Sequence, residues 1–580
     1  MTNLPIEQLR KYRYCNINIL RGDIPTVSLN NNILIEKIVI SIIILAFSAV
    51  FFGAFLGNFL GIIAGAFCAS IFLFWPIYYV KYIEYQTKKQ PDEEILNRFS
   101  NRYYGGLKQH MLKNGFVAIT PKPIVEKSLP EPTPIQNDSF RLWLGTTTGI
   151  LVNLWHKSGM AKEQQVSLSL EEACQNILVL GGIGSGKTTC VMQPLLLQCL
   201  DQNCGGLIFD IKGDVKHAVK EFALATNRNL VFLGPNNHKI NLLDGLTPEV
   251  AASFLKSAFL LNGRGSSDSF WVDTATELCR NTLGILSFVP KHYSLQDLYQ
   301  YLFDLESRDN IDYEISAITS TLDESKTRLL KTYQRYQETI FSQFDNKIKS
   351  GVNATVAQAL SPFNHPALLD AFCSTDCSMV KMGDLFDGTI CLVDMPLSIW
   401  GLGGKVAYTF IKLRFFNLMQ NRNQLQVNQN SPVFFMCDEF QEIVSANREG
   451  LSDLNFWDKS RSSKTIGIIS SQSIASFYAS LGNHDLANAL LQNFRQKLCL
   501  RTEDPTTINF MENLIGKARV KKLSETQGHQ QYSKTISDAR EGVVDAQLFR
   551  ELNPSNAVAI LSLAGQSMDD ILTLLPIYAD

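Results

Sequence analysis

Neither sign of charge predominates in this chain. It carries 53 lysine and arginine residues against 55 aspartate and glutamate residues, and its formal net charge is −2. A protein whose whole surface attracts nucleic acid needs a broad positive field, which this composition does not supply. Any contact with DNA has to come from local basic patches or from the lining of a pore.

Metal-binding clusters of cysteine and histidine are also absent from the sequence. The twelve cysteines include no Cys-x-x-Cys pair, and the eight histidines are dispersed along the chain. The closest cysteines, Cys199 with Cys204 and Cys373 with Cys377, have no further ligand at zinc-finger distance. We therefore expect no structural metal, and we interpret the cysteines as buried apolar residues in a reducing compartment.

Charge is missing altogether from residues 38–80. That span is long enough for two membrane-crossing helices of about 20 residues each, and Gly57-Asn58 offers a turn between them. Lysines and arginines flank both outer ends, so the positive-inside rule places both ends of the chain in the cytoplasm. A buried helical hairpin of a soluble protein is the alternative. We predict a two-helix transmembrane hairpin over 38–80, after a cytoplasmic N-terminal segment, 1–37.

Residues 81–140 connect this hairpin to the rest of the chain. Prolines concentrated at 121–134 favour an extended, semi-rigid spacer. A ligand for a proline-reading module is the alternative, and we predict a linker.

A glycine-rich loop opens the part of the chain that carries chemistry. It follows a short apolar run, Ile177–Leu180, and it has the spacing of a phosphate-binding loop between a strand and a helix. The residues predicted to bind the nucleotide are Gly181, Gly182, Ile183, Gly184, Ser185, Gly186, Lys187, Thr188 and Thr189. Lys187 is expected to reach the β- and γ-phosphates, and the Thr188 hydroxyl to bind Mg²⁺. A chance glycine-rich turn rarely combines this spacing with the Lys-Thr pair, so the sequence predicts ATP and Mg²⁺ as cofactors.

Three apolar runs end in an aspartate and compete for the second magnesium-binding position. They end at Asp210, Asp394 and Asp438, and only Asp438 is followed by another acid, Glu439. A Walker B strand needs one carboxylate for Mg²⁺ and a neighbour that polarises the attacking water. We therefore predict Asp438 as the metal ligand and Glu439 as the general base, with a pair of solvated surface acids as the alternative.

The stretch between these two motifs predicts a helical insertion. Residues 246–375 lack strand alternation and show helical periods instead. The clearest periods are Val250–Leu261, Thr274–Phe288 and Ser325–Phe341. We predict an α/β nucleotide-binding domain in two parts, 141–245 and 376–580, separated by an inserted all-α domain.

Two basic clusters are candidate phosphate contacts. Arg328, Lys331 and Arg335 share one face of a predicted helix. The second cluster comprises Lys517, Arg519, Lys521 and Lys522. Ordinary solvated faces are the interpretation that we favour for both.

A later strand, 465–469, carries two further candidates near its ends. Gln472 follows the strand, where an amide can sense the γ-phosphate, although an ordinary turn is equally compatible with that position. Arg461 precedes the strand and is a candidate arginine finger that crosses a subunit boundary, with a solvated surface arginine as the alternative. Strands at 497–501 and 557–562 are expected to complete a parallel sheet.

Taken together, these features resemble the type IV secretion coupling proteins, the membrane-bound ATPases of bacterial conjugation and effector export. The segments that carry the resemblance are the phosphate loop, Asp210–Asp214, Asn241, Phe270-Trp271, Asp438–Phe440, Ser471–Ser473, and Arg540-Glu541 followed by Leu548. The resemblance implies a RecA-like P-loop fold. It also implies a bacterial inner-membrane protein that forms a homo-hexamer on the cytoplasmic face, with nucleotide between subunits and Arg461 completing the neighbour's site.

The resemblance also implies partners. Relatives of this kind move a relaxase–DNA complex or protein effectors toward the channel components of the secretion system, with or without adaptor proteins. The chain ends soon after its last predicted strand, at Asp580, so we expect the helical insertion or other proteins to select the cargo.

Two other functions fit part of the sequence. A double-stranded DNA pump of the chromosome-segregation type shares the core, but such pumps usually lack a helical insertion of this size. A nucleotide-gated membrane receptor without translocation work would not need the full set of Walker residues. An ABC-type exporter is disfavoured, because no Leu-Ser-Gly-Gly-Gln-like signature stands between the Walker motifs.

Overall fold

The computed structural model describes residues 140–152, 156, 158–261, 269–374, 380–425, 430–446, 450–527 and 532–576. The predicted transmembrane hairpin and the proline-rich linker lie outside these residues. Among the residues that the model does describe, no helix combines the length and apolar character needed to cross a bilayer.

An eleven-stranded sheet forms the centre of the molecule, with the strand order β2-β1-β13-β12-β9-β3-β8-β7-β4-β6-β5. Its strands are β1 (Leu142–Thr147), β2 (Gln165–Leu168), β3 (Ile177–Leu180), β4 (Gly205–Asp210), β5 (Leu230–Leu233), β6 (Ile390–Asp394), β7 (Val433–Cys437), β8 (Thr465–Ser471), β9 (Gln496–Cys499), β12 (Asn556–Leu563) and β13 (Gln566–Thr573). The run from β9 to β5 is parallel. The large parallel sheet confirms the predicted α/β class.

The parallel strands are apolar on both faces, as a sheet covered on both sides requires. In β3, Ile177 and Val179 join one buried cluster, whereas Leu178 and Leu180 join the other. The side chains of β7 alternate between the same two clusters. Each of these strands therefore contributes to two cores.

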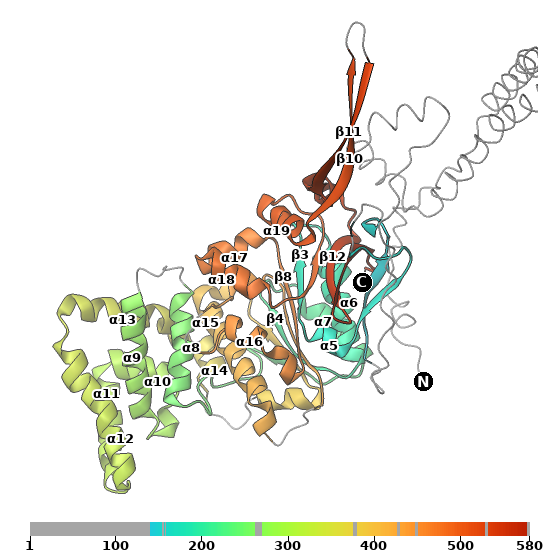
Figure 1. Cartoon of the computed structure of the whole chain (residues 1–580). Coiled ribbons are helices and arrows are strands. Elements are labelled where there is room, and N and C mark those ends of the chain that lie inside the picture. The colour runs from blue at the N-terminus through green and yellow to red at the C-terminus, as the bar shows by residue number, and fades with distance from the viewer. Residues whose placement is uncertain are drawn as a thin grey trace, which may run out of the picture.

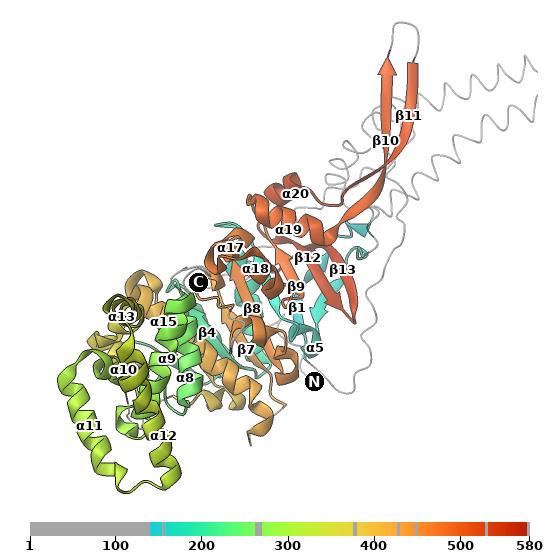
Figure 2. The same ribbon diagram turned by 60° about the vertical axis from the view of Figure 1, so that its left-hand side comes forward.

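Helices cover both faces of the sheet (Figures 1 and 2). Those outside residues 246–375 are α5 (Leu170–Ala173), α6 (Gln193–Asp201), α7 (Lys216–Ala225), α15 (Leu397–Gln420), α16 (Asp453–Trp457), α17 (Ile474–Leu481), α18 (His484–Leu491), α19 (Pro505–Ile515) and α20 (Ala546–Glu551). Helices α6 and α7 pack in one core, and α15 packs in the other.

A succession of helices without a strand follows β5. These helices are α8 (Pro248–Leu260), α9 (Ser269–Leu286), α10 (Leu295–Phe303), α11 (Leu305–Thr319), α12 (Glu324–Arg335), α13 (Asn346–Leu360) and α14 (Pro366–Phe372). Most of them gather at one end of the molecule, and α8 packs against α15 (Figure 1). The chain returns to the sheet at β6, which pairs between β4 and β5.

The prediction of a wholly parallel sheet is wrong at its later strands. Strand β9 is parallel to β3, but β12 runs antiparallel to β9 and to β13. A two-residue turn at Ala564 and Gly565, with φ of +46° and +76°, joins β12 to β13. Such a turn makes an antiparallel hairpin, and the apolar run at 557–562 contains no sign of it.

A second sheet consists of one long hairpin. Strands β10 (Lys517–Gln527) and β11 (Tyr532–Gly542) pair only with each other and project from the body of the molecule (Figure 2). They lie at the opposite end from α11 and α12 (Figures 1 and 2).

Candidate active site

The glycine-rich loop connects β3 to a helical segment, η2 (Thr188–Met192), that continues into α6. Gly184 and Gly186 have φ of +68° and +92°, which side chains disfavour. A Cβ on Gly186 would also lie 3.0 Å from Cys190 Sγ and 3.0 Å from the Pro554 carbonyl oxygen. Glycine is therefore required at position 186 for two separate reasons.

Lys187 folds back over the loop that carries it. Its Nζ donates to the carbonyl oxygens of Gly181 at 2.6 Å and Gly182 at 3.2 Å. Burial lowers the pKa of the Lys187 ammonium, and the carboxylates of Asp438 and Glu439 counteract part of that effect. The ammonium is thus held against its own loop, near enough to the two carboxylates for their charges to affect its pKa.

Asp438 lies at the carboxyl end of β7 and meets the loop across β8. The Thr188 hydroxyl lies 3.5 Å from Asp438 Oδ2. Ser470, in β8, donates to the other oxygen, Oδ1, which also accepts the Glu439 N–H at 3.0 Å. These contacts orient one carboxylate oxygen toward the Thr188 hydroxyl, so the two residues present neighbouring oxygen atoms that could hold a Mg²⁺ ion.

Glu439 is buried and almost completely hydrogen bonded. Gln472 Nε2 donates to its Oε1 at 3.0 Å, and Gln441 Nε2 donates to its Oε2 at 2.7 Å. Lys212 Nζ lies 2.5 Å from the same Oε1. The backbone of Glu439 has a φ of +54°, a conformation that costs a non-glycine residue energy and that clusters at functional sites.

The pKa of Glu439 reflects two opposing effects. Burial raises the pKa of this carboxyl, but the hydrogen bonds from Lys212, Gln441 and Gln472 and the charge of Lys212 outweigh burial, so the pKa lies below its usual value. Glu439 is consequently a carboxylate at neutral pH, the form that a general base needs.

The two other strand-end aspartates have different roles. Asp210 Oδ1 accepts the backbone N–H groups of Gly213 and Asp214, at 2.8 and 3.1 Å, and so shapes the turn after β4. Asp394 Oδ2 pairs with Lys216 Nζ at 2.6 Å. Of the three competitors, only Asp438 contacts Thr188 among the described residues.

Lys212 contacts both acids, at 2.5 Å from Glu439 and 3.5 Å from Asp438, and the sequence alone does not indicate this. It lies in the Asp-Ile-Lys-Gly-Asp stretch after β4, and a lysine in a polar turn is usually exposed to solvent. The missing information is the strand order: β4 pairs directly with β7, which brings the two strand ends together. A charged residue one strand away from Asp438 becomes a candidate only once that pairing is known.

Arg461 does not reach the phosphate loop of its own chain. It lies in a short 3₁₀ helix, Ser460–Ser463, which leads into the amino end of β8, whereas the loop follows the carboxyl end of β3. Because the two strands are parallel, the length of β8, about 20 Å, separates the two features. The Arg461 side chain is 60% exposed and lies 3.4 Å from Glu171.

The two basic clusters lie far from this site along the chain. Arg328, Lys331 and Arg335 are exposed on α12, but Tyr333 points into the core and donates a hydrogen bond to Glu249 at 3.2 Å. The second basic cluster lies on β10. Neither cluster lies on a strand of the eleven-stranded sheet that carries the acid pair.

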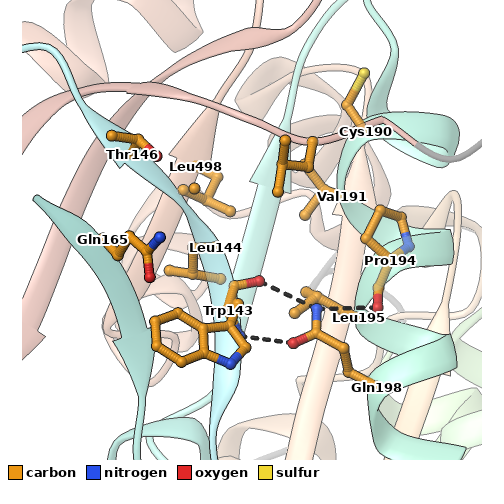
Figure 3. Close-up of a pocket in the computed structure, with 12 residues that line it drawn as sticks. Trp143, Leu144, Thr146, Gln165, Cys190, Val191, Pro194, Leu195, Gln198 and Leu498 are labelled. Carbon is orange, nitrogen blue, oxygen red and sulfur yellow. Dashed lines mark hydrogen bonds between the residues drawn. The ribbon is translucent and has the colours of Figure 1, made fainter. Parts of the chain in front are cut away.

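An apolar pocket lies on the other side of the phosphate loop (Figure 3). Trp143 of β1, Val191 and Leu195 of the loop's helix, and Leu498 of β9 line it. Gln198 closes the wall by hydrogen bonding both backbone groups of Trp143, at 2.7 and 3.1 Å (Figure 3). Since β9 and β8 flank β3 on opposite sides, the pocket and the acid pair are separate features.

Comparison with known proteins supports a specific family. A family model described as "Type IV secretory system Conjugative DNA transfer" matches residues 138–551. No curated protein sequence matches the chain. The unbound bacterial conjugative coupling protein TrwBdeltaN70 is 14% identical, with a TM-score of 0.52 over 72% of this chain and 87% of that one. TrwB in complex with ADP and Mg²⁺ is 14% identical, with a TM-score of 0.51 over 72% of this chain and 87% of that one. TrwB in complex with an ATP analogue is 14% identical, with a TM-score of 0.50 over 70% of this chain and 86% of that one.

The likeness to TrwB, at this identity, shows a shared fold. The family model spans well over half of the chain and includes the phosphate loop, the helical stretch and the acid pair. It confirms the resemblance that the motifs predicted. This chain therefore belongs to the type IV secretory system conjugative DNA transfer family.

Proposed function

We propose that this chain is the inner-membrane ATPase that recruits DNA–protein or protein substrates and drives them into a type IV secretion channel. The observation that carries the proposal is the meeting of Thr188 with Asp438 at 3.5 Å, beside a buried Glu439 held by Gln472. That arrangement would supply a metal ligand pair, a general base and a sensor at the carboxyl ends of neighbouring strands.

The residues of the loop fit a bound triphosphate. Ser185 Oγ is buried and has no hydrogen-bond partner among the described residues, so a phosphate oxygen would satisfy it. Lys187 has three N–H groups, and its contacts within the described residues are the two carbonyl oxygens of the loop. The structures of TrwB with ADP and Mg²⁺ and with ATP and GTP analogues support nucleotide binding at this fold.

Thr188 and Asp438 would hold Mg²⁺, because both present the oxygen atoms that this ion prefers. When bound, the ion neutralises charge on the phosphate oxygens. Lys187 would bind the β- and γ-phosphates, and Glu439 would orient water and take its proton on a carboxylate oxygen. Gln472 would report the loss of the γ-phosphate, since its amide already contacts Glu439.

Assembly as a homo-hexamer would complete this site. Arg461 lies at the amino end of β8, whereas its own loop follows the carboxyl end of β3. In a ring it would therefore serve the loop of a neighbouring subunit. The hairpin predicted at 38–80 would anchor the ring to the membrane with both termini in the cytoplasm. Residues 246–375 form our proposed inserted domain, between the two parts of the nucleotide-binding domain, 141–245 and 376–580.

Hydrolysis by the full chain in lipid tests this proposal. Glu439→Gln should abolish ATP hydrolysis while nucleotide binding persists, because the proton acceptor is lost and the phosphate loop is unchanged. Glu442→Gln is the matched control: Glu442 lies in the same segment but pairs with Lys405 at 2.6 Å. The motor proposal fails if the wild-type protein hydrolyses no ATP with any cargo, or if Glu439→Gln hydrolyses ATP normally.

The effect of DNA on the rate of ATP hydrolysis distinguishes the cargo classes. Single-stranded DNA or a relaxase–DNA complex should increase the rate of hydrolysis by a conjugative motor. Stronger stimulation by double-stranded DNA would favour the chromosome-segregation type of pump.

A further inference from the structure

Lys212 reaches the candidate active site from a neighbouring strand. It follows β4 in a tight turn that Asp210 organises by accepting backbone N–H groups, and β4 pairs directly with β7. The turn therefore delivers Lys212 to the end of β7, where Asp438 and Glu439 lie.

The ammonium of Lys212 contacts both acids. Nζ lies 2.5 Å from Glu439 Oε1 and 3.5 Å from Asp438 Oδ2. The Thr188 hydroxyl lies 3.5 Å from that same Asp438 Oδ2. Lys212 and Thr188 thus share a carboxylate oxygen, which places the ammonium beside the phosphate loop although it belongs to another strand.

Glu439 accepts at three of the four lone-pair sites of its carboxylate. Its Oε1 accepts from Lys212 and from Gln472, and its Oε2 accepts from Gln441. A carboxylate that accepts a proton from water needs a lone pair directed at that water. Both sites of Oε1 are therefore taken, so Lys212 or Gln472 has to leave before that oxygen can accept a proton.

Lys212 is the donor best able to leave. Its side chain is 41% exposed, whereas that of Glu439 is only 6% exposed. Gln441, by contrast, is itself buried in the segment that follows the acid. A lysine has a long flexible stem, so its ammonium can change partners without a change in the sheet.

We propose that Lys212 exchanges its ion pair with Glu439 for the γ-phosphate of bound ATP, and so selects triphosphate over diphosphate. The exchange deepens the proposed function and rests on it. Because Lys212 and Thr188 both contact Asp438 Oδ2, a γ-phosphate bound at the loop would lie within reach of Lys212, and a diphosphate lacks that group. Repulsion from a divalent cation held by Thr188 and Asp438 also favours the departure of Lys212.

The exchange links binding to catalysis. While Lys212 pairs with Glu439, the carboxylate is held by three donors. Once Lys212 moves to the γ-phosphate, Oε1 of Glu439 gains a free lone pair for water. Lys212 is thus a positioning residue for Glu439 and a direct contact for the nucleotide.

Nucleotide selectivity tests the exchange without measuring turnover. Full-length protein in lipid is titrated with ADP and with a non-hydrolysable ATP analogue, both with Mg²⁺, and the ratio of the two Kd values is compared among variants. Lys212→Met, which keeps the length of the stem, should weaken binding of the ATP analogue about tenfold, the size of one charge-assisted hydrogen bond, and leave ADP binding unchanged. Lys212→Arg should keep the selectivity.

Lys216→Met is the matched control. Lys216 lies four residues away and is similarly exposed, but it pairs with Asp394 at 2.6 Å. Its loss should leave both Kd values unchanged. Glu439→Gln should strengthen ATP-analogue binding more than ADP binding, and that gain should shrink in the Lys212→Met, Glu439→Gln double variant, because no ammonium is left to be released.

The outcomes distinguish the two proposals. If the wild-type protein binds neither nucleotide, the proposed function fails and the exchange fails with it. If it binds both, and Lys212→Met changes both affinities by the same factor or changes neither, Lys212 is a structural ion-pair partner and only the exchange is overturned.

Discussion

Gln472 donates a hydrogen bond to Glu439 across two neighbouring strands, with 3.0 Å between Nε2 and Oε1. Strand β8, which leads to Gln472, lies between the strand of the phosphate loop and the strand of the acid pair. Gln472 thus links the end of β8 to the proposed general base.

Gln472→Ala should lower kcat for ATP hydrolysis by about 10²-fold, the size typical of a lost polar group at such a site. Binding of ADP should stay normal, because the proposed role of Gln472 concerns the γ-phosphate, which ADP lacks. Steady-state kinetics and ADP titration measure the two effects. Gln492→Ala, after α18, is the control for loss of an amide elsewhere, and an unchanged kcat in Gln472→Ala would remove this residue from the site.

Arg461→Ala should reduce hydrolysis by about 10³–10⁵-fold, as expected for an arginine finger, with nucleotide binding retained. Because Arg461 and its own loop lie at opposite ends of the parallel strands, the lost hydrolysis should be complemented by another subunit. Mixing Arg461→Ala subunits with Lys187→Ala subunits should restore measurable activity that neither variant has alone.

Glu171→Gln serves as the control for Arg461. It removes the exposed partner that lies 3.4 Å from Arg461 but leaves the arginine in place, so hydrolysis should be normal. Mixed assemblies without recovered activity would count against a finger that acts between subunits.

Much of the site follows from the sequence because its parts are local. The phosphate loop and the acids after β7 each sit at the end of an apolar run, and such runs predict strands from a few neighbouring residues. The contact of Lys212 with the acid pair does not follow from the sequence, for the opposite reason. Its contact with Glu439 depends on the pairing of β4 with β7, and the residues around Lys212 contain no information about that pairing.

The same distinction explains the error in strand direction. The apolar character of 557–562 is enough to predict a strand, and β12 is indeed there. Its direction depends on the path of the chain through α19, the β10–β11 hairpin and α20, and on the turn at Ala564 and Gly565. Direction is a property of the connection, which periodicity does not encode.

Gly186→Ala should destabilise the protein more than Gly184→Ala. Both positions have positive φ, which costs about 1–2 kcal/mol for a side chain. Only at Gly186 would the new Cβ also press on Cys190 Sγ and the Pro554 carbonyl, whereas nothing lies within 4 Å at Gly184. Thermal unfolding of the two variants checks this order, and equal melting temperatures would contradict it.

Asp570 should make stability depend on pH near neutrality. Burial raises the pKa of this carboxyl from 3.8 to about 7, despite the backbone N–H groups of Gly149 and Leu151 that it accepts. Between these values the folded chain holds a proton that the unfolded chain has released. The contribution of Asp570 to stability is therefore greatest in acid and is lost as the pH rises toward 7, by a few kcal/mol in all.

Comparison with Asp570→Asn isolates this contribution. The wild-type melting temperature should fall relative to that of the variant as the pH is raised from about 5 to 8. Asp569→Asn is the matched control, since Asp569 is the adjacent carboxylate and pairs with His156 at 2.6 Å instead. Parallel pH profiles for wild type and Asp570→Asn would contradict the assignment.

Lys412 and Asp453 form an ion pair with no exposed surface on either side chain, at 2.5 Å. Asp453 also accepts hydrogen bonds from the Ser445 N–H at 2.7 Å and from Trp457 Nε1 at 3.0 Å. Lys412 lies on α15 and also donates to the carbonyl oxygen of Ile443. The pair thus ties α15 to the segment that leaves the acid pair.

Lys412→Met should destabilise the protein by about 3–5 kcal/mol, because it leaves the Asp453 carboxylate buried without a counter-charge. Adding Asp453→Asn should recover part of that loss, since the remaining carbonyl still accepts a hydrogen bond and no buried charge is left. Thermal unfolding of the single and double variants measures both steps. If the double variant were less stable than Lys412→Met, the cost would come from packing around α15 rather than from the unpaired charge.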